Sequence, residues 1–153
     1  MIRYYDGQYK AVADVFHNAI HLTTSEHYSE EQILAWAPVP IDYNRWRARC
    51  DLKRPFLYCL EDEIIGFIEL DPDGHIDCHY VHPVHNRKGI GTALLRHVLQ
   101  VATAAKLPRL YVEASHVAKN LYLQHNFSIL AENHVTKGTV TLVNWQMERR
   151  LPH

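Results

Sequence analysis

Residues 80–95 read YVHPVHNRKGIGTALL: an apolar run, a short polar turn with two glycines, and the start of a long segment with helical periodicity. Glycine lets the backbone expose its N–H groups and admit a bulky ligand closely. The first turn of a helix adds unpaired N–H donors and the positive end of the helix dipole. The segment therefore predicts an anion site suited to phosphate or pyrophosphate, with Arg87 and Lys88 adding positive charge at its rim.

Several interpretations of this turn compete. A dinucleotide-binding fingerprint needs a third glycine where Leu94 stands, and a P-loop needs its lysine after the glycine, whereas Lys88 precedes Gly89. Two interpretations remain open on the local motif: the pyrophosphate turn of an acyl-CoA transferase, and a structural strand-to-helix turn that binds nothing.

The patterns on either side predict alternating strands and helices. Ser29 and Gln32 form a capping box, and Asp42 is a suitable N-cap for the next helix. We expect an α/β fold (α+β mixed sheet), with a central mixed β-sheet of about six to seven strands and helices on both faces. The expected strands are 2–5, 56–60, 64–70, 75–81, 110–114, 127–135 and 139–147, and the expected helices are 8–22, 29–37, 43–52, 91–106 and 116–125.

Length and composition narrow the class of protein. The 153 residues predict a single domain, 1–153. The net charge of −1 gives no reason to expect nucleic acid or an anionic membrane as a partner. No apolar window approaches ~18 residues and the N-terminus lacks the pattern of a signal peptide. The three cysteines, Cys50, Cys59 and Cys78, have no metal-like spacing, so we expect a reducing, cytoplasmic location and a buried thiol at Cys78.

Two motifs make the chain resemble the GNAT N-acetyltransferase superfamily. The first is Asn86, two residues, Gly89, one residue and Gly91, directly after a strand; the family usually has Gln or Arg where Asn86 stands. The second runs from Ala114 to Phe127 and is similar to the family's Ala-x-x-(Phe/Leu)-Tyr-x-x-x-Gly-Phe, with Asn126 in place of Gly. Asn tolerates the left-handed helix cap, so that substitution is mild. The resemblance covers most of residues 55–147, and residues 28–38 resemble a bacterial YafP-like branch.

The resemblance implies an acetyl-CoA-dependent enzyme that transfers acetyl directly to a primary amine of a small molecule or peptide. Residues 55–147 would bind acetyl-CoA, and the helices in about 8–52 would shape the acceptor side. The hydroxyl of Tyr122 would face the CoA sulfur as a general acid or hydrogen-bond donor. The N–H of Val81 would polarise the thioester carbonyl. The implied cofactor-binding residues are Tyr80, Val81, His82, Asn86, Arg87, Lys88, Gly89, Ile90, Gly91, Thr92 and Ser115.

The general base is less constrained by the sequence. Strand alternation places His75, Asp77, His79 and Val81 on one face, and polar groups there indicate a wet cleft. Asp77 is the first candidate because it could also bind a cationic acceptor, and His79 and Glu69 follow. Pairing of these groups with one another, without a catalytic role, is an equally open interpretation.

Other functions remain to be considered. A non-catalytic CoA-binding or regulatory domain of the same fold is the main alternative, and a histidine-dependent metal sensor is another. We expect no metal, because the twelve histidines lack a convergent set of ligands. The acceptor cannot be read from the sequence, and either a monomer or a homodimer is compatible with it.

Overall fold

The structure, a computed structural model, describes residues 1–23 and 28–152. Seven strands form one sheet in the order β1-β2-β3-β4-β5-β7-β6. All neighbouring strands are antiparallel except β4 and β5, which are parallel, so the predicted mixed sheet is confirmed. The strands are β1 Ile2–Tyr4, β2 Phe56–Leu60, β3 Glu63–Leu70, β4 His75–Val81, β5 Arg109–Ala114, β6 Ser128–Lys137 and β7 Val140–Arg150.

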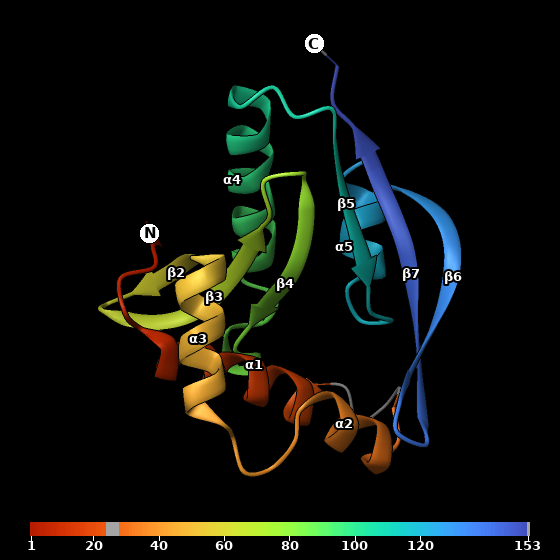
Figure 1. Cartoon of the computed structure of the whole chain (residues 1–153). Helices are drawn as coiled ribbons and strands as arrows, with labels where there is room; N and C mark the ends of the chain where they lie inside the picture. Colours follow the sequence, from red (N-terminus) through yellow and green to blue (C-terminus); the bar gives the residue numbers. More distant parts are fainter. Residues whose placement is uncertain (24–27, 153) are drawn as a thin grey trace.

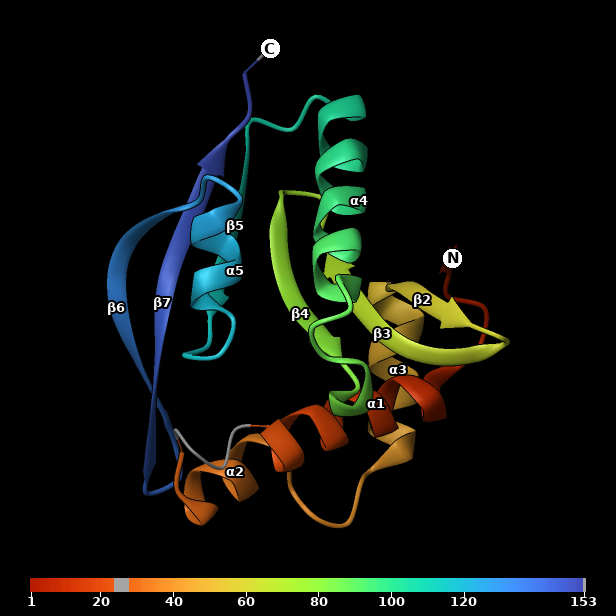
Figure 2. The same cartoon turned by 180° about the vertical axis from the view of Figure 1, so that it is seen from behind.

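Helices cover both faces of this sheet, as predicted. Figure 1 shows α1 and α3 in front of one face, and Figure 2 shows α4 and α5 on the other. The helix α2 lies at the end of the molecule where the β6–β7 hairpin turns. None of the helices in the described part of the chain is long and apolar enough to cross a bilayer. The helices are α1 Tyr9–Thr23, α2 Glu30–Trp36, α3 Tyr43–Lys53, α4 Ile90–Ala104 and α5 Lys119–Gln124, with a 3-10 turn at Pro83–His85.

Local sequence signals account for most of the helix boundaries. The Ser29 hydroxyl accepts a hydrogen bond from the Gln32 amide, and the Gln32 side chain returns one to the Ser29 amide, which confirms the capping box. Asp42 caps α3 through the amide of Arg45. The last helix is shorter than predicted, because residues 115–118 form a turn, in which the Ser115 hydroxyl accepts from the Ala118 amide, before α5 begins at Lys119.

The core packs mainly beneath α4. Its buried residues Leu94, Leu95 and Val98 contact the sheet, and Tyr122 of α5 belongs to the same cluster. A second cluster around Phe67 and Cys78 lies under α1 and α3. The three cysteines are free and buried, as predicted for Cys78, whose thiol pKa is raised well above its usual value by burial.

The parallel pair β4 and β5 separates soon after it forms. Only His75–Tyr111 and Ile76–Val112 are paired, so the two strands diverge beyond Ile76 (Figures 1 and 2). This divergence leaves the later part of β4 with a free edge, and residues of α2, α5 and the β6–β7 hairpin border the opening.

A bulge in β4 changes which side chains share a face. Ile68 pairs with His79 and Leu70 with Ile76, so three steps of β4 lie opposite two steps of β3. The extra residue reverses the alternation at Asp77. The predicted common face from His75 to Val81 is therefore wrong: Asp77 reaches the cations of α3, whereas His79 contacts α4 and α5.

Candidate active site

The glycine turn presents main-chain donors at the start of α4. Gly89 is the N-cap residue, with a φ of 79°, and no side chain caps the helix. Within residues 1–23 and 28–152, the amides of Gly89, Ile90, Gly91 and Thr92 have no hydrogen-bond acceptor. A left-handed Gly89 costs little, and it directs these N–H groups out of the turn. The arrangement suits a phosphate group.

A cavity of about 270 Å³ lies against this turn. Most of the predicted cofactor-binding residues line it, including both glycines and Arg87. Lys88 is exposed and does not line it. The predicted residues in the lining are Tyr80, Val81, Asn86, Arg87, Gly89, Ile90, Gly91, Thr92 and Ser115.

The free edge of β4 determines which backbone groups face the cleft. The His82 amide donates to the Ile65 carbonyl of β3, and antiparallel ladders alternate hydrogen-bonded and non-bonded pairs. The N–H groups of Val81 and His79 therefore point toward the edge that β5 leaves open. His82 differs from the other predicted contacts, because its amide donates to β3 and the residue lines a separate cavity beside α1.

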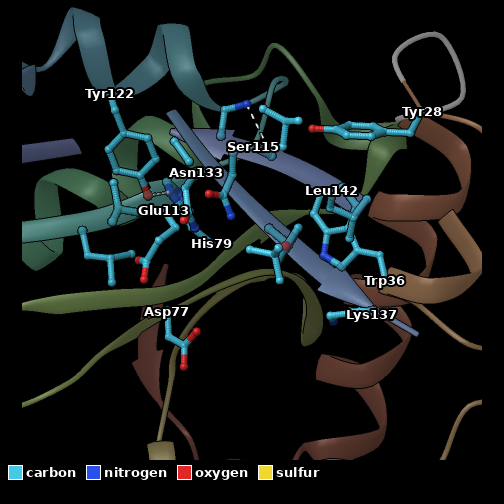
Figure 3. Close-up of a pocket in the computed structure, with 18 residues that line it drawn as sticks. Tyr28, Trp36, Asp77, His79, Glu113, Ser115, Tyr122, Asn133, Lys137 and Leu142 are labelled. Atoms are coloured by element: carbon cyan, nitrogen blue, oxygen red, sulfur yellow. Dashed lines mark hydrogen bonds between the residues drawn. The ribbon is translucent and has the colours of Figure 1, made fainter. Parts of the chain in front are cut away.

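Tyr122 and His79 meet at the centre of the cleft. The Tyr122 hydroxyl lies 2.8 Å from His79 Nδ1, and His79 Nε2 lies 2.9 Å from the carbonyl oxygen of Gly91 (Figure 3). A carbonyl only accepts, so Nε2 carries the proton and donates it. In the neutral imidazole, Nδ1 then accepts from the Tyr122 hydroxyl. The glycine turn thus fixes the histidine tautomer, and the tautomer fixes the direction of the tyrosine O–H.

Burial keeps both groups in their neutral forms. It lowers the pKa of His79 to about 4, despite the hydrogen bond to Gly91 that opposes this shift. The tyrosine ring is fully buried, which raises the pKa of its hydroxyl well above 10. Two neutral groups joined by one hydrogen bond can therefore hold a proton in place across the neutral pH range.

The other two predicted candidates for the base are ion-paired. Glu69 is fully buried and accepts two hydrogen bonds from Arg49 of α3, at 2.7 and 3.0 Å. Asp77 lies 3.0 Å from Arg49 and 2.9 Å from Lys53. Although burial opposes it, the hydrogen bond from Lys53 and both positive charges lower the pKa of Asp77. A carboxylate held in this way is a weak proton acceptor.

A further cavity of about 310 Å³ opens where β4 and β5 diverge. Tyr122, Asp77 and Glu113 lie at one end of it, and Trp36 and Lys137 lie at the other (Figure 3). The two cavities adjoin, because they share the lining residues Trp36, His79, Tyr80, Ser115 and Ala118.

Several lining residues were not among the predicted site residues. Glu113 points into the cavity from β5, and its carboxylate lies 2.6 Å from His75 Nε2. Tyr28 accepts from the His116 amide and so joins the start of α2 to the loop after β5. Strand alternation could have identified Glu113 as a polar residue on an apolar strand. Tyr28, Asn133 and Lys137 carry no local signal, because only tertiary packing brings them to the cleft.

Two acidic groups beside the cleft have the residue types of metal sites: Glu69, Asp77 and Cys78, and Asp71, His75 and Asp77. Cationic side chains already lie among their oxygens. Arg49 contacts Glu69 and Asp77, and Lys53 contacts Asp71 and Asp77. These ammonium and guanidinium groups compensate the charge that would otherwise attract a metal ion.

Comparison with known proteins gives the same identification. The model of the acetyltransferase (GNAT) domain matches residues 24–149. The chain belongs to the GNAT acetyltransferase family. It is 27% identical over 150 residues to the Escherichia coli K12 protein named uncharacterized N-acetyltransferase YafP, covering 98% of this chain and 95% of that one. The predicted enzyme class and the YafP-like resemblance are therefore confirmed.

Solved structures of GNAT proteins share the fold. A Rhodopseudomonas palustris protein, named as a GCN5-related N-acetyltransferase and class-II aminotransferase, has a TM-score of 0.91 at 30% identity, covering 99% of this chain and 95% of that one. The PaiA N-acetyltransferase of Thermoplasma acidophilum, solved in complex with coenzyme A, has a TM-score of 0.77 at 19% identity and 99% and 98% coverage. The predicted fold class is confirmed.

Proposed function

We propose that this GNAT protein, with residues 1–153 forming one domain, transfers acetyl from acetyl-CoA directly to a primary amine. The observation that carries the proposal is the buried Tyr122 hydroxyl, hydrogen-bonded to His79 beside the cavity at the start of α4 and the cavity where β4 and β5 diverge. The coenzyme A complex of the PaiA relative supports the same use of the fold. The hydrogen-bonded pair of Tyr122 and His79 favours an enzyme over a non-catalytic CoA-binding domain, because binding alone does not require a positioned hydroxyl.

Binding would follow from main-chain groups. The amides from Gly89 to Thr92 would donate to the pyrophosphate, and Arg87 would add a positive charge. The free edge of β4 would pair with the amide-bearing arm of the cofactor like an added strand. The Val81 N–H at that edge would then donate to the thioester carbonyl oxygen, where negative charge develops during attack.

The hydroxyl of Tyr122 would act when the thiolate leaves. A thioester sulfur is a weak acceptor, so the O–H stays on His79 Nδ1 before reaction. The amine nitrogen then forms a bond to the carbonyl carbon, the carbon–sulfur bond breaks, and the sulfur becomes a strong acceptor. Rotation of the hydroxyl would give its proton to that sulfur, and the proton that the amine releases would return through solvent to the Tyr122 oxygen. The interaction strengthens only as charge develops, which is the condition for lowering the barrier.

The proton of the attacking amine would pass to Glu113. Its carboxylate lines the acceptor cavity and contacts one ionisable group in the described residues, His75 Nε2 at 2.6 Å, whereas Asp77 is held by two cations and the buried Glu69 by two hydrogen bonds from Arg49. His79 is unsuited because both ring nitrogens have partners. We expect Glu113→Gln to lower kcat by about 10²-fold or more. The isosteric Asp77→Asn should reduce it by less than about tenfold, and the reverse order would reassign the base to Asp77.

A direct assay tests the proposed function. The purified protein is incubated with acetyl-CoA and a panel of primary amines, and free thiol and acetylated amine are both measured. We expect stoichiometric formation of both products with at least one amine. Coenzyme A binding without turnover on any amine would instead support the non-catalytic CoA-binding alternative. Absence of CoA binding would remove both interpretations.

A further inference from the structure

A second, larger cavity adjoins the acceptor side of the catalytic cleft. It has a volume of about 640 Å³, within the range of small-molecule sites. Helix α1, the segment from Trp36 to Asp42, helix α3 and Lys137 at the end of β6 surround it. Trp36 and Lys137 also line the catalytic cavity, where Figure 3 places them at the end opposite Tyr122. A molecule in the second cavity can therefore extend past these two residues toward the reaction centre.

The walls of this cavity are largely aromatic and apolar. Phe16 and Trp46 lie with ring centroids 4.7 Å apart, and Trp36 supplies a third ring. Pro38 and Pro40 complete one side. Rings fixed by packing favour a flat apolar body, because stacking and edge contacts need little reorganisation.

The charges at the cavity are unbalanced. Of its acidic and basic lining residues, Arg49 is paired with Glu69 and Asp77. Asp42 accepts a hydrogen bond from the backbone amide of Arg45, a neutral group that does not offset the charge of the carboxylate, so this carboxylate counts against the cations of the lining. Burial, together with nearby His21, lowers the pKa of His17, which is then neutral at pH 7.

Two cations remain. The guanidinium of Arg45 and the ammonium of Lys137 have no carboxylate partner among residues 1–23 and 28–152. Both are exposed and able to meet a ligand. At the far end of the adjoining catalytic cavity lie the carboxylates of Glu113, which contacts His75, and of Asp77, which contacts Arg49 and Lys53.

We propose that the acceptor is an aryl or arylalkyl amine that carries an anionic group on the side of the ring remote from the amine. The amine would point toward Tyr122 and Glu113, the ring would lie among Trp36, Trp46 and Phe16, and the anion would meet Arg45 and Lys137. The two cations without an ion-pair partner lie at one end only, so they select an acceptor with an anionic group and set its direction of binding. The inference rests on the proposed acetyl transfer and adds the chemistry of the acceptor.

Matched probes test the charge requirement. Acetyl transfer is measured to 4-(aminomethyl)benzoate, to the neutral near-isostere 4-(aminomethyl)benzamide, and to the aliphatic dication 1,4-diaminobutane. We expect kcat/KM for the carboxylate to exceed that for the amide by about tenfold, the combined effect of two exposed charge pairs. The dication should be the poorest substrate, because both free cations repel it.

Variants assign the effect to the two cations. In the double variant Arg45→Met, Lys137→Met, the preference for the carboxylate over the amide should fall to within about threefold of unity. Arg47→Met is the matched control, because Arg47 lies on the same helix over the Tyr9 ring and outside the cavity lining. It should keep the wild-type preference.

The possible failures are separable. Equal use of the carboxylate and the amide, a preference for the dication, or a preference that survives the double variant would overturn the inference and leave the proposed acetyl transfer intact. So would transfer only to amines that lack a ring. Absence of transfer to every amine tested would remove the proposed function and this inference together.

Discussion

Removing the hydroxyl of Tyr122 separates its proposed chemical role from its structural role. The ring is fully buried and packs against Phe127, so Tyr122→Phe keeps the packing and deletes one oxygen. That oxygen has one hydrogen-bond partner in the described residues, His79 Nδ1 at 2.8 Å. The substitution therefore leaves one buried acceptor unpaired, which costs about 1–3 kcal/mol of unfolding free energy.

The expected loss of activity is larger than the loss of stability. Loss of a general acid lowers kcat by roughly 10²–10⁴-fold, or about 3–5 kcal/mol of barrier at ~1.36 kcal/mol per tenfold. The KM for acetyl-CoA should change by less than about threefold, because main-chain amides at the start of α4 would hold the phosphates. We would measure kcat by thiol release and the unfolding free energy by urea titration, on the same preparations.

A matched control excludes a general effect of losing a tyrosine hydroxyl. Tyr43 donates a hydrogen bond to Asp14 at 2.6 Å, between α3 and α1 and away from the cleft. Tyr43→Phe should leave kcat unchanged. If Tyr122→Phe is folded and turns over at close to the wild-type rate, the assignment of Tyr122 as the acid is refuted. If kcat falls only in proportion to the unfolded fraction, its role is structural.

Three further outcomes follow from the same contacts. The pKa of His79 is about 4 in the folded protein, compared with 6.5 for an ordinary histidine. As the pH falls from 6.5 to 4, this histidine therefore takes up a proton in the unfolded chain but not in the folded protein. Stability should thus drop by about 2 kcal/mol between pH 7 and pH 5 through this residue, and that increment should vanish from urea titrations of His79→Gln. A Cβ at Gly91 would lie 3.7 Å from both His79 and Val81, so Gly91→Ala should keep the free energy of unfolding unchanged or raise it by up to about 1 kcal/mol. The same Cβ should weaken CoA binding about tenfold in calorimetry, because it would obstruct close approach of the cofactor. Unchanged affinity would argue against that approach. Arg49→Met leaves the buried Glu69 carboxylate without its cation and should lower the free energy of unfolding by about 3–5 kcal/mol, measured by thermal or urea unfolding. Glu69→Gln should cost less, because Arg49 is 34% exposed and still pairs with Asp77. Equal losses in the two variants would contradict this expectation.

Much of this molecule follows from local sequence signals. Periodicity located nearly every strand and helix, and the caps at Ser29 and Asp42 fixed two helix starts, because capping depends on side chains three residues apart. The glycine turn predicted an anion site for a similar reason: a positive φ at Gly89 and the free amides of a helix start are properties of adjacent residues. The two motifs and the family they indicate belong to this level.

The chemistry of the cleft required the tertiary structure. A bulge in β4, invisible to strict alternation, turned Asp77 toward α3 and His79 toward α5. The hydrogen bond between Tyr122 and His79 joins residues 43 positions apart in the sequence. It forms because β5 diverges from β4, which lets Tyr122 of α5 reach the side chain of His79. Sequence determines which residues carry donors, acceptors and charge, since these are properties of each side chain. Which of them meet is decided by strand register and packing, because those depend on contacts between distant segments.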